Sequence, residues 1–336
     1  MPRVRRFFAV FLVGILVIVM LACSAGEVDE EVVEENNNLI VVGFSQPGAE
    51  SAWRVALTDS VKDAFSEENG YKLIYKDGQS KQDNQIRDIR TFIQQGVDYI
   101  ILCPIVETGW DTVLEEAKQA GIPVIVCDRN VTADNSLYKA FVGSNFSAEG
   151  DAAIHYLEEK YGPDENGEEP EVNIVHIQGT IGSSAQLGRT QALEEALATH
   201  ENWHLVAQEC GEFTKAKSRE LMTDVLKTVP ADSIDVLYCE NDEEALGAIQ
   251  ALNDAHVPYG DEITIISFDG SRNALELCKK GEINLVVECN PLQGPYLYSI
   301  ISMINDGVGV PKITYIDEKY FTPEDLTEDF IENRKY

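Results

Sequence analysis

The fold class is most clearly encoded in the segment Tyr99–Arg129, YIILCPIVETGWDTVLEEAKQAGIPVIVCDR. This segment holds two short apolar, β-branched runs, Tyr99–Cys103 and Pro123–Cys127, with a segment of helical length between them. A strand, a helix and a second strand in this order form a right-handed βαβ unit whose strands are parallel. The alternation continues along the chain from Leu39, so the sequence predicts an α/β fold whose parallel sheets are covered by helices on both faces.

The strand-like runs recur with helical segments between nearly all of them. We predict strands at Leu39–Phe44, Tyr71–Tyr75, Tyr99–Cys103, Pro123–Cys127, Phe141–Gly143, Asn173–Ile177, His204–Gln208, Val236–Cys239, Thr264–Ser267 and Leu285–Glu288. One helix is marked by Ala245, Ile249 and Leu252 at i, i+4 and i+7, behind an acidic first turn that suits the helix dipole. A single open sheet of ten strands would be unusual. The sequence therefore predicts two doubly wound parallel-sheet lobes of about five strands each.

The N-terminus has the order of a signal peptide with a lipidation site. A basic start precedes an uncharged apolar stretch of 15 residues, Phe7–Leu21, which is short for a membrane span of about 20 residues. The three residues before Cys23, Met20 to Ala22, resemble the lipobox of bacterial lipoproteins, with Met in place of the more usual Leu. We predict a signal peptide at 1–22 and lipidation of Cys23. A transmembrane anchor and a signal peptide cut elsewhere are the alternatives.

The chain is strongly acidic. Its 336 residues hold 26 Lys and Arg against 58 Asp and Glu, a formal net charge of −32. Phosphate binding depends on Lys and Arg, so this balance argues against nucleic acid as a partner. Residues 23–38 are rich in Glu, Asp and Asn, and we expect a self-repelling tether that holds the folded body off the outer face of the cytoplasmic membrane.

The other cysteines do not form a metal motif. They stand singly, without CxxC spacing, at Cys103, Cys127, Cys210, Cys239, Cys278 and Cys289. A zinc site is therefore not expected, while a disulfide between Cys103 and Cys127 stays open. The chain also lacks a Ser-His constellation and a GK[ST] phosphate loop. We expect no cofactor, no bound metal and no enzymatic activity.

Polar and aromatic side chains follow nearly every predicted strand. Ligands of doubly wound sheets bind at the carboxyl ends of the strands, so these positions are the candidate site. They are the segments 46–54, 128–129, 178–189, 211–214, 240–242, 269–270 and 288–291. Each segment alone says little, because surface loops are often polar. Their recurrence at one edge of both sheets indicates a binding site.

Several motifs also resemble a known family. VGFSQ (42–46), ESAWR (50–54), DGQSKQDNQIRDIRTFI (77–93), NDEEALGAIQA (241–251) and ISFDG (266–270) stand in the same order as in the sugar-binding periplasmic-type proteins of ATP-driven (ABC) importers. The resemblance runs from about Val42 to the last helices and is greatest to the members that bind galactofuranose. It implies the type I periplasmic-binding-protein fold, in which two lobes joined by a three-strand hinge hold the ligand between them.

The resemblance also implies lobe boundaries and partners. The N-terminal lobe would comprise 39–142 and 291–313, the C-terminal lobe 143–290, and residues 314–336 would be a tail that crosses the lobes. The expected partners are a monosaccharide, an ABC permease with its ATPase, and the membrane through the lipid anchor. The protein is expected to be a monomer.

Nine positions match the family's ligand contacts. They are Glu50, Trp53, Arg54, Asp128, Arg129, Arg189, Phe213, Asn241 and Asp269. The arginines would donate forked hydrogen bonds to sugar hydroxyls and the ring oxygen, the carboxylates would accept, Asn241 could do both, and the two aromatic rings would face sugar C–H groups. Without the resemblance, the rings would be core residues and Asp128-Arg129 a local ion pair. The roles of Trp110, Glu288 and Asn290 stay open.

The charges among these nine residues indicate the class of ligand. Three arginines face three carboxylates, so the site sums to about zero although the chain is acidic. A site for a sugar acid or a phosphosugar should keep an unpaired cation. The balance therefore predicts a neutral monosaccharide, galactofuranose or a related sugar.

Three other functions are compatible with parts of this pattern. A sugar sensor that signals to a membrane receptor or histidine kinase would bind its ligand in the same way. A secreted glycosidase needs a carboxyl whose pKa is raised, whereas Glu50 and Asp128 stand near Arg54 and Arg129 in sequence, which should lower their pKa values. A sugar-responsive repressor is set aside because a signal segment stands where a DNA-binding helix-turn-helix would be.

Overall fold

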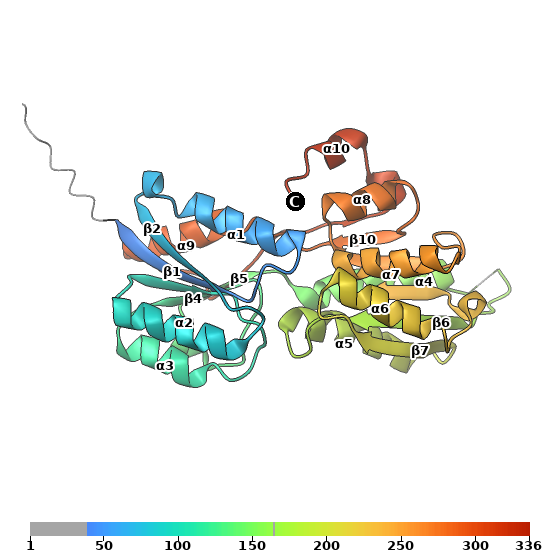
Figure 1. Ribbon diagram of the computed structural model, residues 1–336, viewed down its shortest axis with the longest axis horizontal. Coiled ribbons are helices and arrows are strands. Elements are labelled where there is room, and N and C mark those ends of the chain that lie inside the picture. Colours follow the sequence, from blue (N-terminus) through green and yellow to red (C-terminus); the bar gives the residue numbers. More distant parts are fainter. Residues whose placement is uncertain (1–38, 164) are drawn as a thin grey trace, which may run out of the picture. The chain divides into compact units, whose positions relative to one another are not determined.

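The computed structural model describes residues 39–163 and 165–336 (Figure 1). The predicted signal peptide, the lipidation site Cys23 and the predicted tether lie outside the described residues. Among the residues that are described, none of the helices combines the length and the apolar character that a membrane crossing requires.

The first sheet has six parallel strands in the order β11-β5-β4-β3-β1-β2. They are β1 (Ile40–Gln46), β2 (Tyr71–Asp77), β3 (Tyr99–Leu102), β4 (Val124–Cys127), β5 (Ala140–Gly143) and β11 (Ile313–Tyr315). The helices α1 (Ala52–Ala64) and α9 (Gly294–Asn305) cover one face, and α2 (Gln82–Gln95) and α3 (Asp111–Gln119) cover the other (Figure 1). We call this sheet with its helices lobe 1.

The second sheet also has six strands, in the order β12-β10-β9-β8-β6-β7. They are β6 (Val172–Gln178), β7 (Trp203–Cys210), β8 (Val236–Cys239), β9 (Thr264–Asp269), β10 (Leu285–Glu288) and β12 (Tyr320–Phe321), of which β12 alone runs antiparallel to its neighbour. One face packs on α4 (Phe146–Tyr161) and α5 (Ser184–Thr199). The other packs on α6 (Lys215–Val225), α7 (Asp242–Asp254) and α8 (Arg272–Lys279), with α10 (Glu328–Glu332) beside α8. We call this sheet with its helices lobe 2.

The predicted alternation of strands and helices is confirmed. All ten predicted strands are present with ends that shift by two residues at most, and the helix predicted from Ala245, Ile249 and Leu252 is α7. The expectation of about five strands per lobe was wrong by one strand, because the C-terminal residues add β11 to one sheet and β12 to the other. These are edge strands of three and two residues, too short for a recognisable apolar run.

The chain passes between the sheets three times. It leaves β5 and enters α4 through residues 144–145, returns from β10 to α9 through 289–293, and crosses again from β11 to β12 through 316–319. We call these three segments the crossovers. Two parallel sheets joined in this way confirm the predicted α/β fold with two lobes and a three-strand hinge.

Strand alternation explains which side chains reach the site. Ile100 and Leu102 of β3 pack toward α2 and α3, whereas Ile101 and Cys103 pack on the face covered by α1 and α9. Both faces are fully buried here, as parallel strands require. The chain leaves each strand at the same edge of the sheet, so the residues that follow β1 and β4 meet there.

Candidate functional site

All nine predicted ligand residues line one pocket. Residues from lobe 1 are Glu50, Trp53, Arg54, Asp128 and Arg129, and residues from lobe 2 are Arg189, Phe213, Asn241 and Asp269. Ser51, Phe146, Ala185 and Cys289 complete the lining. The structure thus brings together residues that lie up to 219 positions apart in the sequence (Glu50 to Asp269). Their contact with a ligand stays a prediction.

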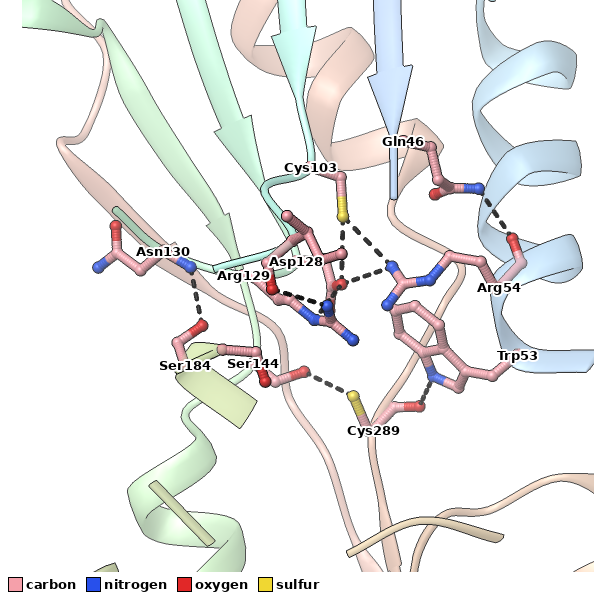
Figure 2. Close-up of polar contacts among 12 residues, drawn as sticks. Gln46, Trp53, Arg54, Cys103, Asp128, Arg129, Asn130, Ser144, Ser184 and Cys289 are labelled. Carbon is pink, nitrogen blue, oxygen red and sulfur yellow. Dashed lines mark hydrogen bonds and ion pairs between the residues drawn. The ribbon is translucent and has the colours of Figure 1, made fainter. Parts of the chain in front are cut away.

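Arg54 lies at the start of α1, where the Ser51 side chain caps the helix by accepting a hydrogen bond from the Arg54 amide. Its guanidinium donates from Nη1 to Asp128 Oδ2 at 2.6 Å (Figure 2). It also donates from Nε to Glu50 Oε1 at 3.3 Å. Burial opposes the charge of Arg54, but Asp128, Cys103 and Glu50 outweigh burial and raise its pKa. Arg54 is therefore charged and held in place before any ligand arrives.

Glu50 stays ionised for the same reason. Burial opposes its charge, but Arg54 and Arg129 outweigh burial and hold the pKa of this carboxyl below its ordinary value. Its Oε2 atom is buried without a hydrogen-bond partner among the described residues. An acceptor in this position can accept a hydrogen bond from a ligand hydroxyl.

Two aromatic rings lie against the arginines. The Arg54 guanidinium lies 4.7 Å from the centre of the Trp53 ring, and the Arg129 guanidinium of lobe 1 lies 5.1 Å from the centre of the Phe213 ring of lobe 2. Trp53 also donates from Nε1 to the carbonyl oxygen of Cys289 at 2.6 Å (Figure 2). Such contacts between guanidinium groups and ring faces are stabilising when desolvated.

The Phe213 ring depends on a glycine. A Cβ atom on Gly179, which follows β6, would lie 1.9 Å from the Phe213 Cζ atom. Only glycine at this position lets the ring lie so close to the backbone. Phe213 and Trp53 also belong to the apolar cluster of lobe 1. Each ring is therefore partly a core residue, which is the alternative role that the sequence allowed for both.

Arg189 on α5 lies between two rings, with its guanidinium 5.3 Å from the Phe146 ring centre and 4.7 Å from the Phe268 ring centre. Its Nε donates to Glu149 Oε2 at 2.7 Å, and its Nη2 lies 3.7 Å from Asp269 Oδ1. Glu149 was not among the predicted residues. The expected balance of three arginines and three carboxylates was therefore incomplete, because Arg189 has a fourth carboxylate beside it.

Burial shifts the titration of both carboxyls near Arg189. It raises the pKa of Asp269 well above the ordinary range, although Arg189 opposes this, and it raises the pKa of Glu149 in the same way. Both shifts favour the neutral form of these carboxyls. Each arginine of the pocket still has a carboxyl group within 4 Å, so none of the three stands apart as a cation for an anionic ligand.

Asn241 has a structural duty as well. It is the N-cap of α7, where its Oδ1 accepts from the Glu244 amide at 2.9 Å, and its Nδ2 donates to the carbonyl oxygen of Phe213 at 3.4 Å. Glu244 in turn accepts from the Phe213 amide at 2.9 Å. Asn241 therefore both starts a helix and fixes the loop that carries Phe213.

Three of the nine residues have unusual backbone angles. The φ angles of Asp128, Phe213 and Asp269 are 59°, 60° and 104°. Residues other than glycine seldom adopt this region, and such strain gathers at binding sites. Asp128 directly follows β4, Phe213 lies in the loop after β7 and Asp269 is the last residue of β9, and all three line the pocket.

Trp110, Glu288 and Asn290, whose roles the sequence leaves open, all lie outside the lining of the pocket. Trp110 lies in the core of lobe 1 and donates from Nε1 to the Val106 carbonyl oxygen. Glu288 pairs with Arg334 at 2.7 Å, and Asn290 lies outside the pocket, so Cys289 alone of the three residues 288–290 lines it. All six cysteines in the described part of the chain are free thiols, and Cys103 contacts Arg54 and Asp128 at 3.2 Å each instead of pairing with Cys127.

The lobes also touch beside the pocket. The Glu107 amide donates to the Gly182 carbonyl oxygen at 2.9 Å, and the Asn130 amide donates to Ser184 Oγ at 2.9 Å (Figure 2). The free volume left in the pocket is about 20 Å³, room for about one water molecule. A ligand of several heavy atoms can enter only when the lobes or these side chains move apart.

Sequence reasoning missed Phe146, Glu149 and Cys289. Phe146 and Glu149 lie in the first turn of α4, which follows the first crossover rather than a strand of the same sheet. Cys289 was recognised as a strand-end residue, but its alternation with Glu288 and Asn290 left its direction open. Only the path of the crossovers shows that Phe146 and Glu149 lie against Arg189, and that the Cys289 carbonyl oxygen accepts from Trp53.

Comparison with known proteins adds a family and its relatives. Residues 42–307 match the family described as periplasmic binding protein domain. The chain is 36% identical over 299 residues to the galactofuranose-binding protein YtfQ of Escherichia coli (strain K12), covering 88% of this chain and 92% of that protein.

Two solved structures share the fold at similar identity. One, from Mycobacterium smegmatis, is a complex with β-D-fucofuranose; it is 39% identical with a TM-score of 0.78, over 85% of this chain and 92% of that chain. The other is the periplasmic binding protein component of the arabinose ABC transporter from Shewanella sp. ANA-3, bound to α- and β-L-arabinofuranose; it is 37% identical with a TM-score of 0.80, over 88% of this chain and 95% of that chain. All three relatives are tied by name or by ligand to a furanose sugar.

Proposed function

This chain belongs to the family of periplasmic binding protein domains, and from that membership we propose that it binds a neutral furanose sugar, galactofuranose or a related monosaccharide, between its lobes. Its relatives are solute-binding proteins of sugar transport and not enzymes. The chain is accordingly a sugar-binding protein and not an enzyme.

One observation carries the proposed site. Nine polar and aromatic residues from both lobes line a single pocket, and the arginines there already face carboxylates. A neutral polyhydroxylated ligand can exchange hydrogen bonds with such pairs without leaving an unpaired charge. An anionic sugar would instead meet Glu50 and Asp128 without a spare cation.

Ring form is the proposed basis of selection. The sugar must fit between the Trp53 ring, the Phe213 ring and forked donors that are already fixed by carboxylates. A buried donor or acceptor that misses its hydroxyl is strongly penalised, so a six-membered ring that displaces one hydroxyl should bind far more weakly than the furanose.

Calorimetry on the purified protein tests this proposal. Galactose, fucose and arabinose, whose solutions contain furanose and pyranose forms, are compared with the locked methyl β-D-galactofuranoside and methyl β-D-galactopyranoside. We expect binding of one or more free sugars and discrimination between the locked rings in favour of the furanoside. Absence of heat and of a thermal shift with every sugar would contradict sugar binding, and preference for the pyranoside would contradict the ring form.

We further propose that the protein is a lipoprotein on the outer face of the cytoplasmic membrane. Lipidation of Cys23, an acidic tether at 23–38 and delivery of the sugar by a monomer to an ABC permease and its ATPase follow from the lipobox resemblance and from the relatives' roles in transport. The lobe boundaries 39–142 with 291–313, 143–290 and the tail 314–336 belong to the same proposal. Replacement Cys23→Ala should release the protein from the membrane fraction or change its processing. Unchanged retention of that variant would contradict lipidation.

A further inference from the structure

The three crossovers each contribute a polar group to one cluster, in which Ser144, Glu149 and Cys289 are buried and Glu318 is partly buried. Ser144 comes from the first crossover, Cys289 from the second and Glu318 from the third, and Glu149 joins them from the first turn of α4. Three side-chain atoms of this cluster lie within 4.8 Å of one another: a carboxylate oxygen of Glu149, Sγ of Cys289 and a carboxylate oxygen of Glu318. We call these four residues the hinge cluster.

The hydrogen bonds of the hinge cluster converge on Glu318. Glu318 Oε1 accepts from Ser144 Oγ at 2.6 Å and from the Asn290 amide at 2.6 Å. Ser144 Oγ also contacts Cys289 Sγ at 3.3 Å. Each crossover is thus bonded to the other two through Glu318, and these bonds can persist only while the crossovers keep their present register.

Glu149 brings an incomplete set of bonds to the cluster. Its Oε2 accepts from Arg189, but its Oε1 is buried without a hydrogen-bond partner in the part of the chain that the structure describes. The residue is 4% exposed, so water cannot serve this oxygen freely. A buried, unpaired carboxylate oxygen is costly, and it lies beside a second carboxyl.

The charged groups around the cluster favour a state in which one proton is bound to Glu149 or Glu318. Arg189 faces Glu149 and compensates one negative charge, while Cys289 and Asp269 add acidic groups on the other sides. Burial and the neighbouring Glu149 raise the pKa of Glu318 to about 9, and burial raises that of Glu149. Two carboxylates this close cannot both ionise at neutral pH without a strong penalty.

A metal ion fits less well than a proton. Two donors already point at Glu318 Oε1, and a guanidinium already occupies Glu149 Oε2. These leave fewer free ligand atoms than the four of a structural zinc site or the six to eight oxygens of a calcium site. A proton needs only the unpaired Glu149 Oε1 and one oxygen of Glu318.

We propose that Glu149 and Glu318 share one proton across the hinge, and that closure of the lobes around the sugar takes up this proton. The proposal rests on the proposed sugar binding, because closure is the step to which the proton is linked. When the lobes separate, the crossovers shift against one another, and Glu318 moves away from Glu149 into water. Loss of the Ser144 and Asn290 donors favours the protonated form, but release from burial and from Glu149 outweighs that loss, and the proton leaves. Glu149 remains bonded to Arg189, so the same residue connects the proton to the pocket.

The direction of the pH effect follows from this linkage. Glu318 binds its proton more tightly in the closed form than in the open form, where we expect the ordinary carboxyl range. Below that range both forms are protonated, and affinity does not depend on this group. As the pH rises from there to about 9, affinity should fall, with a limiting slope of about tenfold per pH unit.

Calorimetry in two buffers of different ionisation enthalpy tests the proposal. At pH 7.5 the wild-type protein should take up close to one proton per sugar bound, and its dissociation constant should rise between pH 6 and pH 9. Glu318→Gln keeps an amide that can bond Ser144 and Glu149, and it should abolish most of the uptake and flatten the pH profile. The matched control is Asp317→Asn, which removes one carboxylate from the exposed neighbouring position and should leave the uptake unchanged.

The outcomes separate the two proposals. Heat of binding without any dependence on buffer contradicts the shared proton and leaves sugar binding intact. Equal proton uptake in the wild type and in Glu318→Gln also contradicts it and assigns the proton to another group, such as Asp269. Stoichiometric metal in the purified protein with affinity lost to a chelator would replace the proton by a cation. If no sugar gives heat in any buffer, sugar binding fails and the linkage fails with it.

Discussion

Arg54 contacts four side chains in and beside the pocket. It bonds Asp128 and Glu50, contacts Cys103 Sγ at 3.2 Å and lies on the Trp53 ring. Since all of these groups are nearly excluded from solvent, the effective dielectric constant is low and each contact is stronger than on the surface. Arg54 therefore both orders the site and presents donors to it.

Replacement Arg54→Ala should weaken sugar binding by about ten- to a hundredfold, since about 1.4 kcal/mol corresponds to a tenfold change in affinity. The loss combines the missing donors with the unpaired Asp128 that remains. Titration calorimetry measures it. The matched control is Arg219→Ala, which removes an equivalent charge from an exposed pair with Asp254 and should leave affinity unchanged. Wild-type affinity in Arg54→Ala would remove this residue from the site.

The sequence predicted residue types at the pocket better than their partners. Trp53 and Arg54 lie in the first turn of α1 after β1, Asp128 directly follows β4, and Asp269 ends β9. The sheet topology alone brings such residues to one edge. The contact of Glu149 with Arg189 could not be predicted, because it depends on how α4 packs against α5 after the crossover. The small volume of the pocket could not be predicted either, because it depends on the separation of the lobes and not on the order of residues.

At the scale of elements, α7 joins stability to the site. Its N-cap is the pocket residue Asn241, and its first turn supplies Glu244, which accepts from the Phe213 amide. The acidic first turn predicted from the sequence is present and suits the helix dipole. A change at the cap therefore affects the helix and the Phe213 loop together.

Two substitutions separate these effects. Asn241→Ala removes the cap and should lower the free energy of unfolding by about 1 kcal/mol, together with affinity for the sugar. Asn241→Ser keeps a capping oxygen but loses the amide that contacts the Phe213 carbonyl, so stability should largely return while affinity stays reduced. Thermal denaturation and calorimetry of both variants measure this. Equal loss of stability in the two variants would show that the cap is not the source.

The strands of the C-terminal residues were the elements that sequence reasoning missed. Long buried strands show as apolar runs because both of their faces are covered, as in β3 and β4. By contrast β11 has exposed residues at both ends and β12 one exposed residue of two. The third crossover places β11 beside β5 in one sheet and β12 beside β10 in the other. A local sequence pattern does not contain this information about pairing.

At the scale of the whole molecule, the chain has a large negative net charge, whereas the arginines of the pocket are paired with carboxylates. The chain carries −32 overall, whereas each arginine of the pocket lies within 4 Å of a carboxylate. Electrostatic attraction of ligands by the acidic surface would matter only for cations. A neutral sugar is insensitive to it.

Affinity for the sugar should accordingly change less than about twofold between low and high salt, because screening acts on exposed charges and hardly on buried pairs. Calorimetry at several sodium chloride concentrations measures this. The Arg219→Ala variant serves as a control for surface charge. A decline in affinity that follows ionic strength closely would instead indicate a charged ligand.

The bond from Trp53 to the second crossover has an optical consequence. The chain contains three tryptophans; Trp110 and Trp203 are buried in apolar clusters away from the pocket, while the Trp53 indole lines it and bonds the Cys289 carbonyl. The emission of an indole depends on the polarity and the hydrogen bonds around it, so a sugar at this ring, or a movement of the crossover, changes the signal of one tryptophan against two constant ones. The unlabelled protein is thereby its own fluorescent sensor of occupancy.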